Sequence, residues 1–165
     1  MKPAYCLVAG LAALLLSGAT VQAQDLVTVG EVGPWGVYVD PTLGNGCLIN
    51  AEFEDGSDVR IGFDVESEGA YMIAANPAWG EIVEGETYPL SFDLDGSEYE
   101  GEGTGIYIDG LPGVDIAFES VDLLVDIAAR QTLTLRSQGE AVMAIDLTDS
   151  AEALVMAIEC QEKQG

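Results

Sequence analysis

Histidine is absent from the 165 residues, and lysine and arginine together number only 5. Histidine is the commonest general base near neutral pH, so catalytic sites of the Ser-His-Asp and Cys-His types are excluded. A Ser-Lys pair would depend on Lys163, which lies in a polar tail where little can desolvate it. The hydrolytic chemistry that stays open is that of paired carboxylates, which suffices for glycosides.

Acidic residues greatly outnumber basic residues in this chain. The chain holds 29 acidic residues and has a formal net charge of −24, which becomes −25 if Lys2 is removed. A protein with this negative charge repels nucleic acid and anionic membrane surfaces, so neither is expected as a partner. The acidic residues are spread from Asp25 to Glu162 and do not form a tail. We interpret them as a solvated surface suited to a saline habitat, where salt screens the self-repulsion.

The first 23 residues have the pattern of a secretory signal peptide. Lys2 is the single charge, an apolar run extends from Cys6 to Leu16, and small residues end the segment at Ala23. The run is shorter than the roughly 20 residues that a membrane-spanning helix needs. We therefore expect cleavage after Ala23, a location in the periplasm or outside the cell, no membrane segment afterwards, and a single β-rich domain at residues 24–165.

Cysteine is rare, and loss of Cys6 with the signal peptide would leave only Cys47 and Cys160. In an exported chain, two cysteines predict one disulfide, and the alternative is two free buried thiols. A redox role is disfavoured because no Cys-x-x-Cys motif is present. Closing so long a loop is expected to stabilise the fold by about 4 to 5 kcal/mol at most.

Short stretches of period-two alternation predict most of the chain to be β-strand. About eight or nine strands are expected, the clearest at residues 35–39, 47–53, 59–63, 70–75, 87–94, 114–118, 131–136 and 141–147, while residues 24–34 are interpreted as a lead-in. Pro89 is expected to place its strand at an edge or a bulge. The predicted fold class is mainly β, an antiparallel β-sandwich or partly open barrel with one or two short helices near the C-terminus.

Two segments late in the chain carry helical patterns. Residues 120–130 alternate like a strand but also present a helical stripe, and we predict a helix with Ser120 as its cap. A second helix is predicted after Asp149 or Ser150, with the buried stripe Ala151, Leu154, Val155 and Ile158. Nine residues beyond Ala151, Cys160 would lie opposite this stripe, so the helix must end earlier or Cys47 must lie beside it.

Two acidic residues are the metal candidates of the sequence. Asp93 and Asp95 precede Gly96, and clustered carboxylates suit calcium. The glycine stands two positions too early for an EF-hand loop, and a hairpin turn at Asp95-Gly96 is the alternative. No other cofactor is expected, since the glycine-rich residues 101–105 lack the spacing of a dinucleotide loop and favour a flexible strand or bulge.

Five aromatic residues are candidates for a ligand-binding face that stacks on sugar rings or on a peptide: Trp35, Tyr38, Trp79, Tyr88 and Tyr99. The alternative is that they fill the core, which is the commoner use of large aromatic side chains.

Several motifs follow one another in an order known from one protein family. They are Leu123-Leu124-Val125, the predicted strand at residues 131–136, the turn at Gly139 and the run at residues 147–154, preceded by Trp35-Gly36-Val37 and Cys47. This order resembles the invasion-associated locus B family, small exported proteins of alphaproteobacteria linked in some pathogens to host-cell entry. The extreme acidity and scarcity of basic residues depart from that family.

The resemblance and the missing catalytic motifs together predict a non-enzymatic, exported binding protein. Its partner would be a protein or an envelope component. The alternatives are a carboxylate-dependent hydrolase such as a glycosidase, and a structural envelope protein without a discrete ligand.

Overall fold

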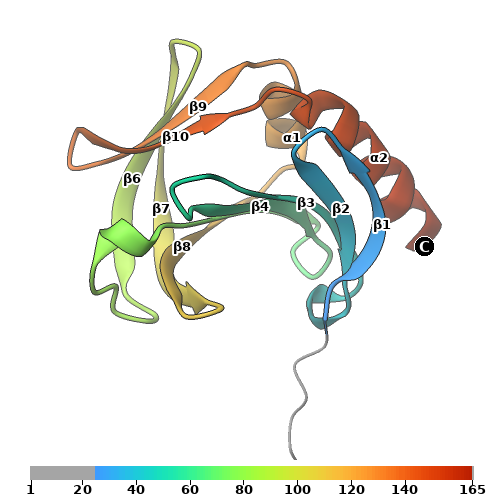
Figure 1. The fold of residues 1–165 in the computed structure, drawn as a ribbon, viewed down its shortest axis with the longest axis horizontal. Coiled ribbons are helices and arrows are strands. Elements are labelled where there is room, and N and C mark those ends of the chain that lie inside the picture. The colour runs from blue at the N-terminus through green and yellow to red at the C-terminus, as the bar shows by residue number, and fades with distance from the viewer. Residues whose placement is uncertain (1–24, 165) are drawn as a thin grey trace, which may run out of the picture.

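The computed structural model describes residues 25–164. Over that range, ten strands form one antiparallel sheet in the order β1-β2-β3-β4-β5-β8-β7-β6-β9-β10 (Figure 1). The strands are β1 (Val27–Val32), β2 (Trp35–Asp40), β3 (Gly46–Glu52), β4 (Asp58–Asp64), β5 (Gly69–Ala75), β6 (Thr87–Leu94), β7 (Ser97–Ile108), β8 (Leu111–Phe118), β9 (Thr132–Ser137) and β10 (Glu140–Asp146). The α-helices are α1 (Asp122–Ala128) and α2 (Ser150–Gln164), and η1 (Pro41–Leu43) and η2 (Pro77–Trp79) are single 3-10 turns.

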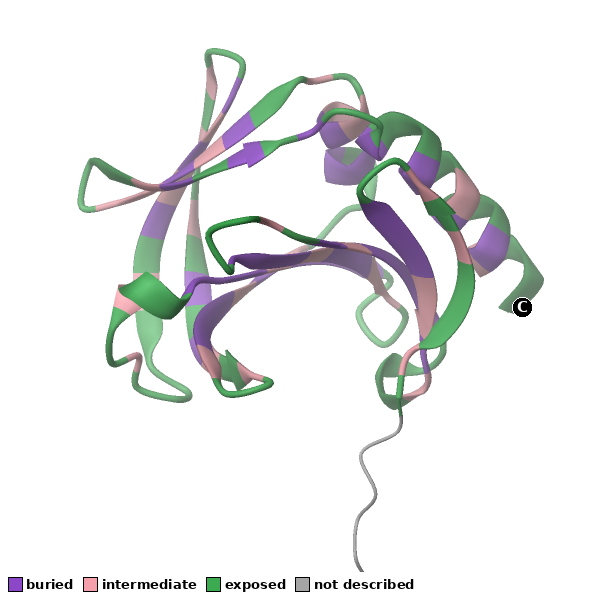
Figure 2. Cartoon of the chain, viewed as in Figure 1, coloured by how far each residue is buried: buried purple, intermediate pink, exposed green. Residues whose placement is uncertain are grey.

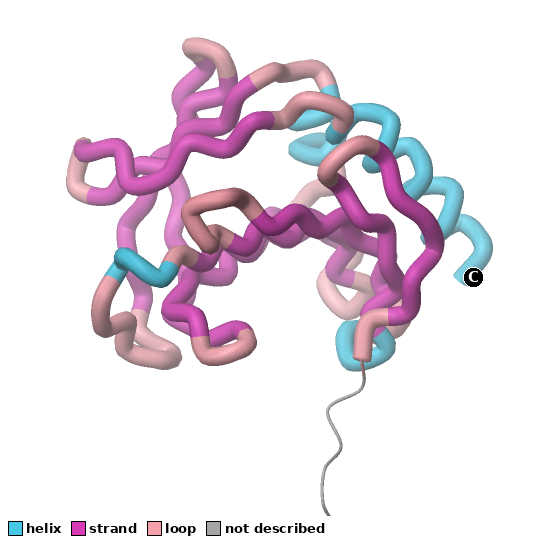
Figure 3. The backbone as a smooth tube through the Cα atoms, viewed as in Figure 1, coloured by secondary structure: helices cyan, strands magenta, loops and turns pink. Residues whose placement is uncertain are grey.

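The sheet curls on itself without closing into a barrel. Strands β9 and β10 stand opposite β3 and β4, and α2 covers the side that remains open next to β1 and β2 (Figures 1 and 3). The two sheet edges, β1 and β10, do not pair with each other. The predicted class, mainly β with short helices late in the chain, is therefore confirmed in its partly open form.

One apolar core fills the inside of the curl. The alternation along each strand places every second residue there, so Val37, Ile49, Ile61 and Met72 are fully buried on neighbouring strands. Leu135 reaches the same core from the far half of the sheet. Figure 2 shows this as a buried lining with exposed turns around it. The aliphatic pattern thus decides which face of the sheet turns inward.

One strand prediction is corrected at the β1 edge of the sheet, and inside the sheet the structure decides between strand and bulge for the glycine-rich residues. The segment interpreted as a lead-in forms edge strand β1, whose weak pattern reflects its exposed Val27 and Val29 and a register shift between Thr28 and Gly30. Strand β7 is a regular strand through the glycine-rich residues 101–105, with no bulge in its pairing to β6.

The expectation for Pro89 holds locally. Strand β6 lies inside the sheet, but its pairing with β9 begins only at Leu90, and Pro89 pairs with β7 alone. Pro89, which has no N–H, therefore lies at a point where β6 is paired on one side only.

Residues 120–130 contain a helix, as predicted. In α1, Leu123, Leu124 and Ile127 are buried, which is the helical stripe of the sequence. The Ser120 hydroxyl oxygen accepts a hydrogen bond from the Asp122 N–H at 3.1 Å, although the residue at the N-cap position is Val121. Burial of the stripe against the core therefore overrides the competing strand pattern.

The predicted buried stripe of α2 is confirmed at Leu154 and wrong at Ala151, Val155 and Ile158. The buried residues are Ser150, Ala153, Leu154, Ala157 and Cys160. Val155 is 54% exposed and Ile158 is 36% exposed. The helix packs on β1, β2 and β3 through a face that combines Leu154 with the smaller Ala153 and Ala157. Cys160 consequently lies on the buried face of an uninterrupted helix, which resolves the expected conflict with Cys47.

The predicted disulfide joins Cys47 to Cys160, with their Cα atoms 6.1 Å apart. Beside it, the Cys47 N–H donates to the Gln161 side-chain oxygen at 2.8 Å. The Trp35 indole N–H donates to the Thr148 carbonyl at 3.0 Å. Strands β2 and β3 are thus tied to the C-terminal segment by one covalent and two hydrogen bonds.

The expected signal peptide lies outside the described residues. Within residues 25–164, no helix has the length and apolar character that a membrane crossing requires.

Candidate binding cleft

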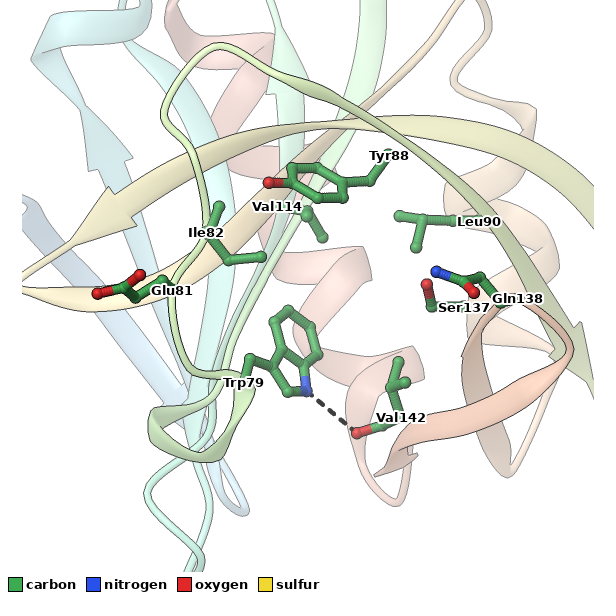
Figure 4. A pocket seen from close by; sticks show the side chains of 9 residues that line it. All are labelled: Trp79, Glu81, Ile82, Tyr88, Leu90, Val114, Ser137, Gln138 and Val142. Atoms are coloured by element: carbon green, nitrogen blue, oxygen red, sulfur yellow. Dashed lines mark hydrogen bonds between the residues drawn. The ribbon is translucent and has the colours of Figure 1, made fainter.

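An open cleft of about 270 Å³ lies where the β5–β6 connection approaches the β9–β10 hairpin. Figure 4 shows its side chains arranged around a central space. They come from four separate stretches of chain and are Trp79, Glu81, Ile82, Tyr88, Leu90, Val114, Ser137, Gln138 and Val142. Only the tertiary fold brings these stretches together.

Trp79 is placed by a capped 3-10 turn. The Asn76 side-chain oxygen accepts from the Ala78 N–H at 2.7 Å, while its amide donates to the Ser57 hydroxyl at 2.8 Å. These bonds hold η2 at the end of β5, with Pro77 at its first position. The Trp79 indole N–H then donates to the Val142 carbonyl at 3.2 Å (Figure 4). The ring is half-buried and forms one wall of the cleft.

Val142 can accept this bond because β10 is irregular there. The pairing of β10 with β9 shifts register between Ala141 and Met143, which leaves Val142 as the extra residue of a bulge. Bulges on edge strands redirect a residue out of the regular ladder. Here the bulge directs the carbonyl towards Trp79 and the valine side chain into the cleft.

The wall continues beyond Trp79 into a loop that is fixed to the sheet by several hydrogen bonds. The Val83 N–H donates to the Tyr88 hydroxyl at 2.9 Å, and the Tyr107 hydroxyl donates to the Ile82 carbonyl at 2.9 Å. A Cβ at Gly105 would collide with the Val83 carbonyl oxygen and approach the Ile82 and Tyr88 side chains. Gly105 therefore allows the loop to pack directly on β7 and keeps Ile82 at the cleft.

The chemistry of the cleft is apolar with a polar rim. Leu90 and Val114 are buried at its base. Exposed Glu81 and Gln138, with half-buried Ser137, supply a carboxylate, an amide and a hydroxyl. An aromatic or aliphatic group can be buried here while its polar neighbours bond to the rim.

A second, smaller cavity of about 150 Å³ lies on the outer face of the sheet. It is lined by Asp64, Glu66, Tyr71 and Asp115 among others. Burial, together with the Asp64 charge, raises the pKa of the Asp115 carboxyl, and its Oδ1 has no hydrogen-bond partner among the described residues. Hydrogen bonds from Ser67 lower the pKa of Asp64, and burial raises the pKa of the Tyr71 hydroxyl. Two neighbouring carboxylates thus have opposite shifts.

The five aromatic candidates separate into different environments. Trp35 is fully buried in the core, and Tyr38 is half-buried with its ring against Gly36. Trp79 and Tyr88 line the cleft, and Tyr99 stacks on Phe92 elsewhere in the sheet. Of the cleft residues, Ile82, Ser137, Gln138 and Val142 were not identified from the sequence, since no local pattern relates a loop, a turn and a bulge.

Asp93 and Asp95 serve a turn and a neighbouring loop. Asp93 accepts from the Gly96 N–H at 3.1 Å, and Asp95 accepts from the N–H groups of Gln131 at 2.8 Å and Thr132 at 3.2 Å. In the part of the chain that the structure describes, no three acidic or cysteine side chains are grouped as metal ligands. The hairpin at Asp95-Gly96 is present, while calcium binding stays a prediction.

The fold is similar to that of a known protein. The crystal structure of invasion associated protein B from Bartonella henselae matches with a TM-score of 0.58 and 14% sequence identity, covering 80% of this chain and 96% of that one. No protein-family model matches the sequence, and no curated protein does. At this identity the likeness is one of fold, which agrees with the resemblance noted in the order of the sequence motifs.

Proposed function

We propose that the mature chain is an exported, non-enzymatic binding protein that holds a protein or envelope component through the Trp79 cleft. The observation that carries this proposal is the cleft itself, which has an apolar base and an aromatic wall held by the Trp79 to Val142 hydrogen bond. Such a surface buries one apolar group of a partner. The absence of histidine from the sequence removes the commonest catalytic base near it.

Export is supported by chemistry at the other end of the molecule. The Cys47–Cys160 disulfide is of the kind that persists in oxidising compartments such as the bacterial periplasm. The pattern of residues 1–23 supplies a leader for that route. The fold shared with invasion associated protein B gives coarse support to a place among such exported proteins.

Partner capture from a periplasmic extract tests the proposal. The protein would be compared with the variants Trp79→Ala and Ile82→Ala, which remove walls of the cleft, and with Val155→Ala, an exposed position on α2. We expect a partner retained by the native chain and by Val155→Ala, and about tenfold less of it on each cleft variant. Equal retention by all four proteins would reject the cleft as the binding site.

The fluorescence of the two tryptophans provides an independent readout. In Trp79→Phe the remaining emission comes from buried Trp35 and should be insensitive to acrylamide and to the partner. In the native chain, binding in the cleft should change the emission of half-buried Trp79. A captured partner that leaves this emission unchanged would bind elsewhere on the protein.

The opposite pKa shifts of Asp64 and Asp115 favour a second candidate, a carboxylate-dependent hydrolase such as a glycosidase. Two carboxylates with separated pKa values provide an acid and a base. Turnover of a glycoside panel that is lost in both Asp64→Asn and Asp115→Asn, but kept in Trp79→Ala, would establish it. If no partner is captured and no glycoside is hydrolysed, the remaining candidate is the third one, a structural envelope protein.

A further inference from the structure

Strands β7 and β8 separate partway along the sheet. Strand β7 pairs with β6 along residues 97–104, but with β8 only along residues 104–108. Beyond Asp115, β8 pairs with β5 alone. Within the described residues, the first half of β7 therefore has no strand on its second side. We call the space between residues 97–103 of β7 and residues 116–118 of β8 the β7–β8 gap.

Hairpin geometry determines which backbone groups face the gap. Asp95 and Gly96 have φ of 49° and 92°, as in a two-residue type I′ turn, and Leu94 and Ser97 are the closing pair. That pair exchanges two hydrogen bonds, and bonded and non-bonded pairs alternate from there. The alternation makes Pro89 part of a non-bonded pair, as its missing N–H requires.

The same alternation directs the N–H and C=O groups of Glu98, Glu100 and Glu102 away from β6 and towards the gap. Across the gap, the corresponding groups of Ala117 point away from β5, since Asp115 bonds towards β7 two residues earlier. No hydrogen bond to these backbone groups occurs within residues 25–164. The gap thus presents a free strand edge inside the sheet.

The inner side of the gap is mostly apolar. A cavity of about 370 Å³ opens there, with Phe92, Tyr99, Ile116, Phe118 and Leu123 in its lining. Two carboxylates also line it, Glu119 and Asp126, and Asp126 accepts a hydrogen bond from the Tyr99 hydroxyl at 3.3 Å. Phe92 stacks on Tyr99 with centroids 5.1 Å apart and meets Phe118 edge-on at 5.7 Å. A strand lying in the gap would bury every second side chain against these rings.

The outer side of the gap is acidic. Glu98, Glu100 and Glu102 are exposed at alternate positions, so their side chains share the outer face of β7 at a repeat of about 7 Å. The side chains of an added strand that point outward would meet this row of carboxylates.

We infer that the β7–β8 gap is a docking site for an extended peptide segment whose side chains alternate between basic and apolar. The peptide backbone would hydrogen-bond to the backbone groups of Glu98, Glu100 and Glu102 and so add a strand to β7. The apolar and acidic faces of the gap would select the side chains of the peptide. Charge complementarity selects lysine or arginine on the outer face, because the whole chain carries a net charge of −24. The gap shares no lining residue with the Trp79 cleft, so this inference stands apart from the proposed function.

Amide hydrogen exchange with a synthetic peptide tests the inference. The probe is a blocked peptide of about nine residues that alternates lysine and valine, compared with one in which the lysines and valines form two separate blocks. In the free protein, the N–H groups of Glu98, Glu100 and Glu102 should exchange rapidly. The alternating peptide should slow their exchange at least about tenfold and leave edge strand β10 unchanged.

Variants of one position separate backbone pairing from charge. Glu100→Pro removes an N–H that faces the gap without removing a bond to β6 and should weaken binding about tenfold. Glu100→Gln keeps that N–H and should weaken binding about threefold. Glu159→Gln removes an exposed charge from α2 and should change affinity little.

Three results would overturn the inference. The first is equal affinity for the alternating and the block peptide, which would show attraction by charge alone. The second is protection of β1 or β10 amides in place of those of β7. The third is unchanged exchange at β7 with either peptide. Loss of the Trp79 cleft function in other experiments would not affect any of these outcomes.

Discussion

The indole N–H of Trp35 donates to the backbone carbonyl of Thr148 at 3.0 Å, across a sequence separation of 113 residues. The ring is fully buried and meets Phe53 edge-on at 6.2 Å. The bond therefore anchors the loop before α2 to the first strand of the core. Near the other end of α2, the Cys47–Cys160 disulfide forms a second attachment of the helix to the sheet.

Replacing Trp35 with phenylalanine should lower the free energy of unfolding by about 2 kcal/mol. The substitution leaves the Thr148 carbonyl without its donor and opens space in the core. Trp79→Phe is the matched control, since it also removes an indole bond to a carbonyl, but from a half-buried ring, and should cost about 1 kcal/mol. Chemical denaturation measures both. A smaller loss for Trp35→Phe than for the control would contradict the anchoring role.

Removing the disulfide should destabilise the protein by about 2 to 5 kcal/mol. The Cys47→Ala/Cys160→Ala double variant frees the C-terminal helix from β3 and enlarges the unfolded ensemble. Thermal unfolding of this variant, and of the native chain with and without reductant, measures the effect. The double variant itself should not respond to reductant. A native chain whose melting temperature is unaffected by reduction would refute this prediction.

Adjacent positions on α2 should differ strongly in their tolerance of the same new charge. Ala157→Asp places a carboxylate on the face packed against the sheet and should cost about 3 kcal/mol or more. Ile158→Asp adds the same charge at an exposed position and should change stability by about 0.5 kcal/mol at most. Circular dichroism melting curves compare them. The reverse order would support the helical stripe that the sequence pattern predicted.

Asp115→Asn should stabilise the protein at neutral pH. A carboxyl with a raised pKa in the folded state contributes stability below its ordinary pKa, and that contribution is lost as the pH rises through the folded value. The gain should therefore shrink as the pH falls through the raised pKa of the folded state, and it should be absent below the ordinary value of about 4.

Asp64→Asn is the control with the opposite sign. The pKa of Asp64 is lowered in the folded state, so its carboxylate stabilises the fold at pH values above the ordinary pKa. This contribution is lost as the pH falls through the pKa of the folded state. Melting temperatures across about pH 3 to 7 compare the two variants. A gain from Asp115→Asn that grows on acidification would contradict the assignment.

Added salt should raise the melting temperature. The formal charge of −24 makes the folded chain repel itself, and about 1 M salt shortens the screening length to about 3 Å. Scanning calorimetry at low and at molar sodium chloride measures the shift, with a neutral osmolyte as the control. A melting temperature that stays level or falls with salt would argue against the saline interpretation of the acidic surface.

Local patterns were sufficient for most elements of the fold. Period-two alternation identified strands such as β2, β4 and β9, and glycine-containing turns marked their ends. The two cysteines of residues 24–165 predicted their own pairing, because a chain with two has one intramolecular choice. Each of these inferences depends on neighbouring residues or on a count.

The tertiary structure decided what depends on distant segments. The helical period could not show which stripe of α2 is buried, because packing on β1, β2 and β3 decided between two apolar faces and left Val155 and Ile158 exposed. The Trp79 cleft exists because a bulge at Val142 meets a turn 63 residues earlier. The sequence by itself thus determined most of the strands, the charge and the disulfide. Long-range packing, which has no signature in the local sequence pattern, determined which face of α2 is buried and where the Trp79 cleft forms.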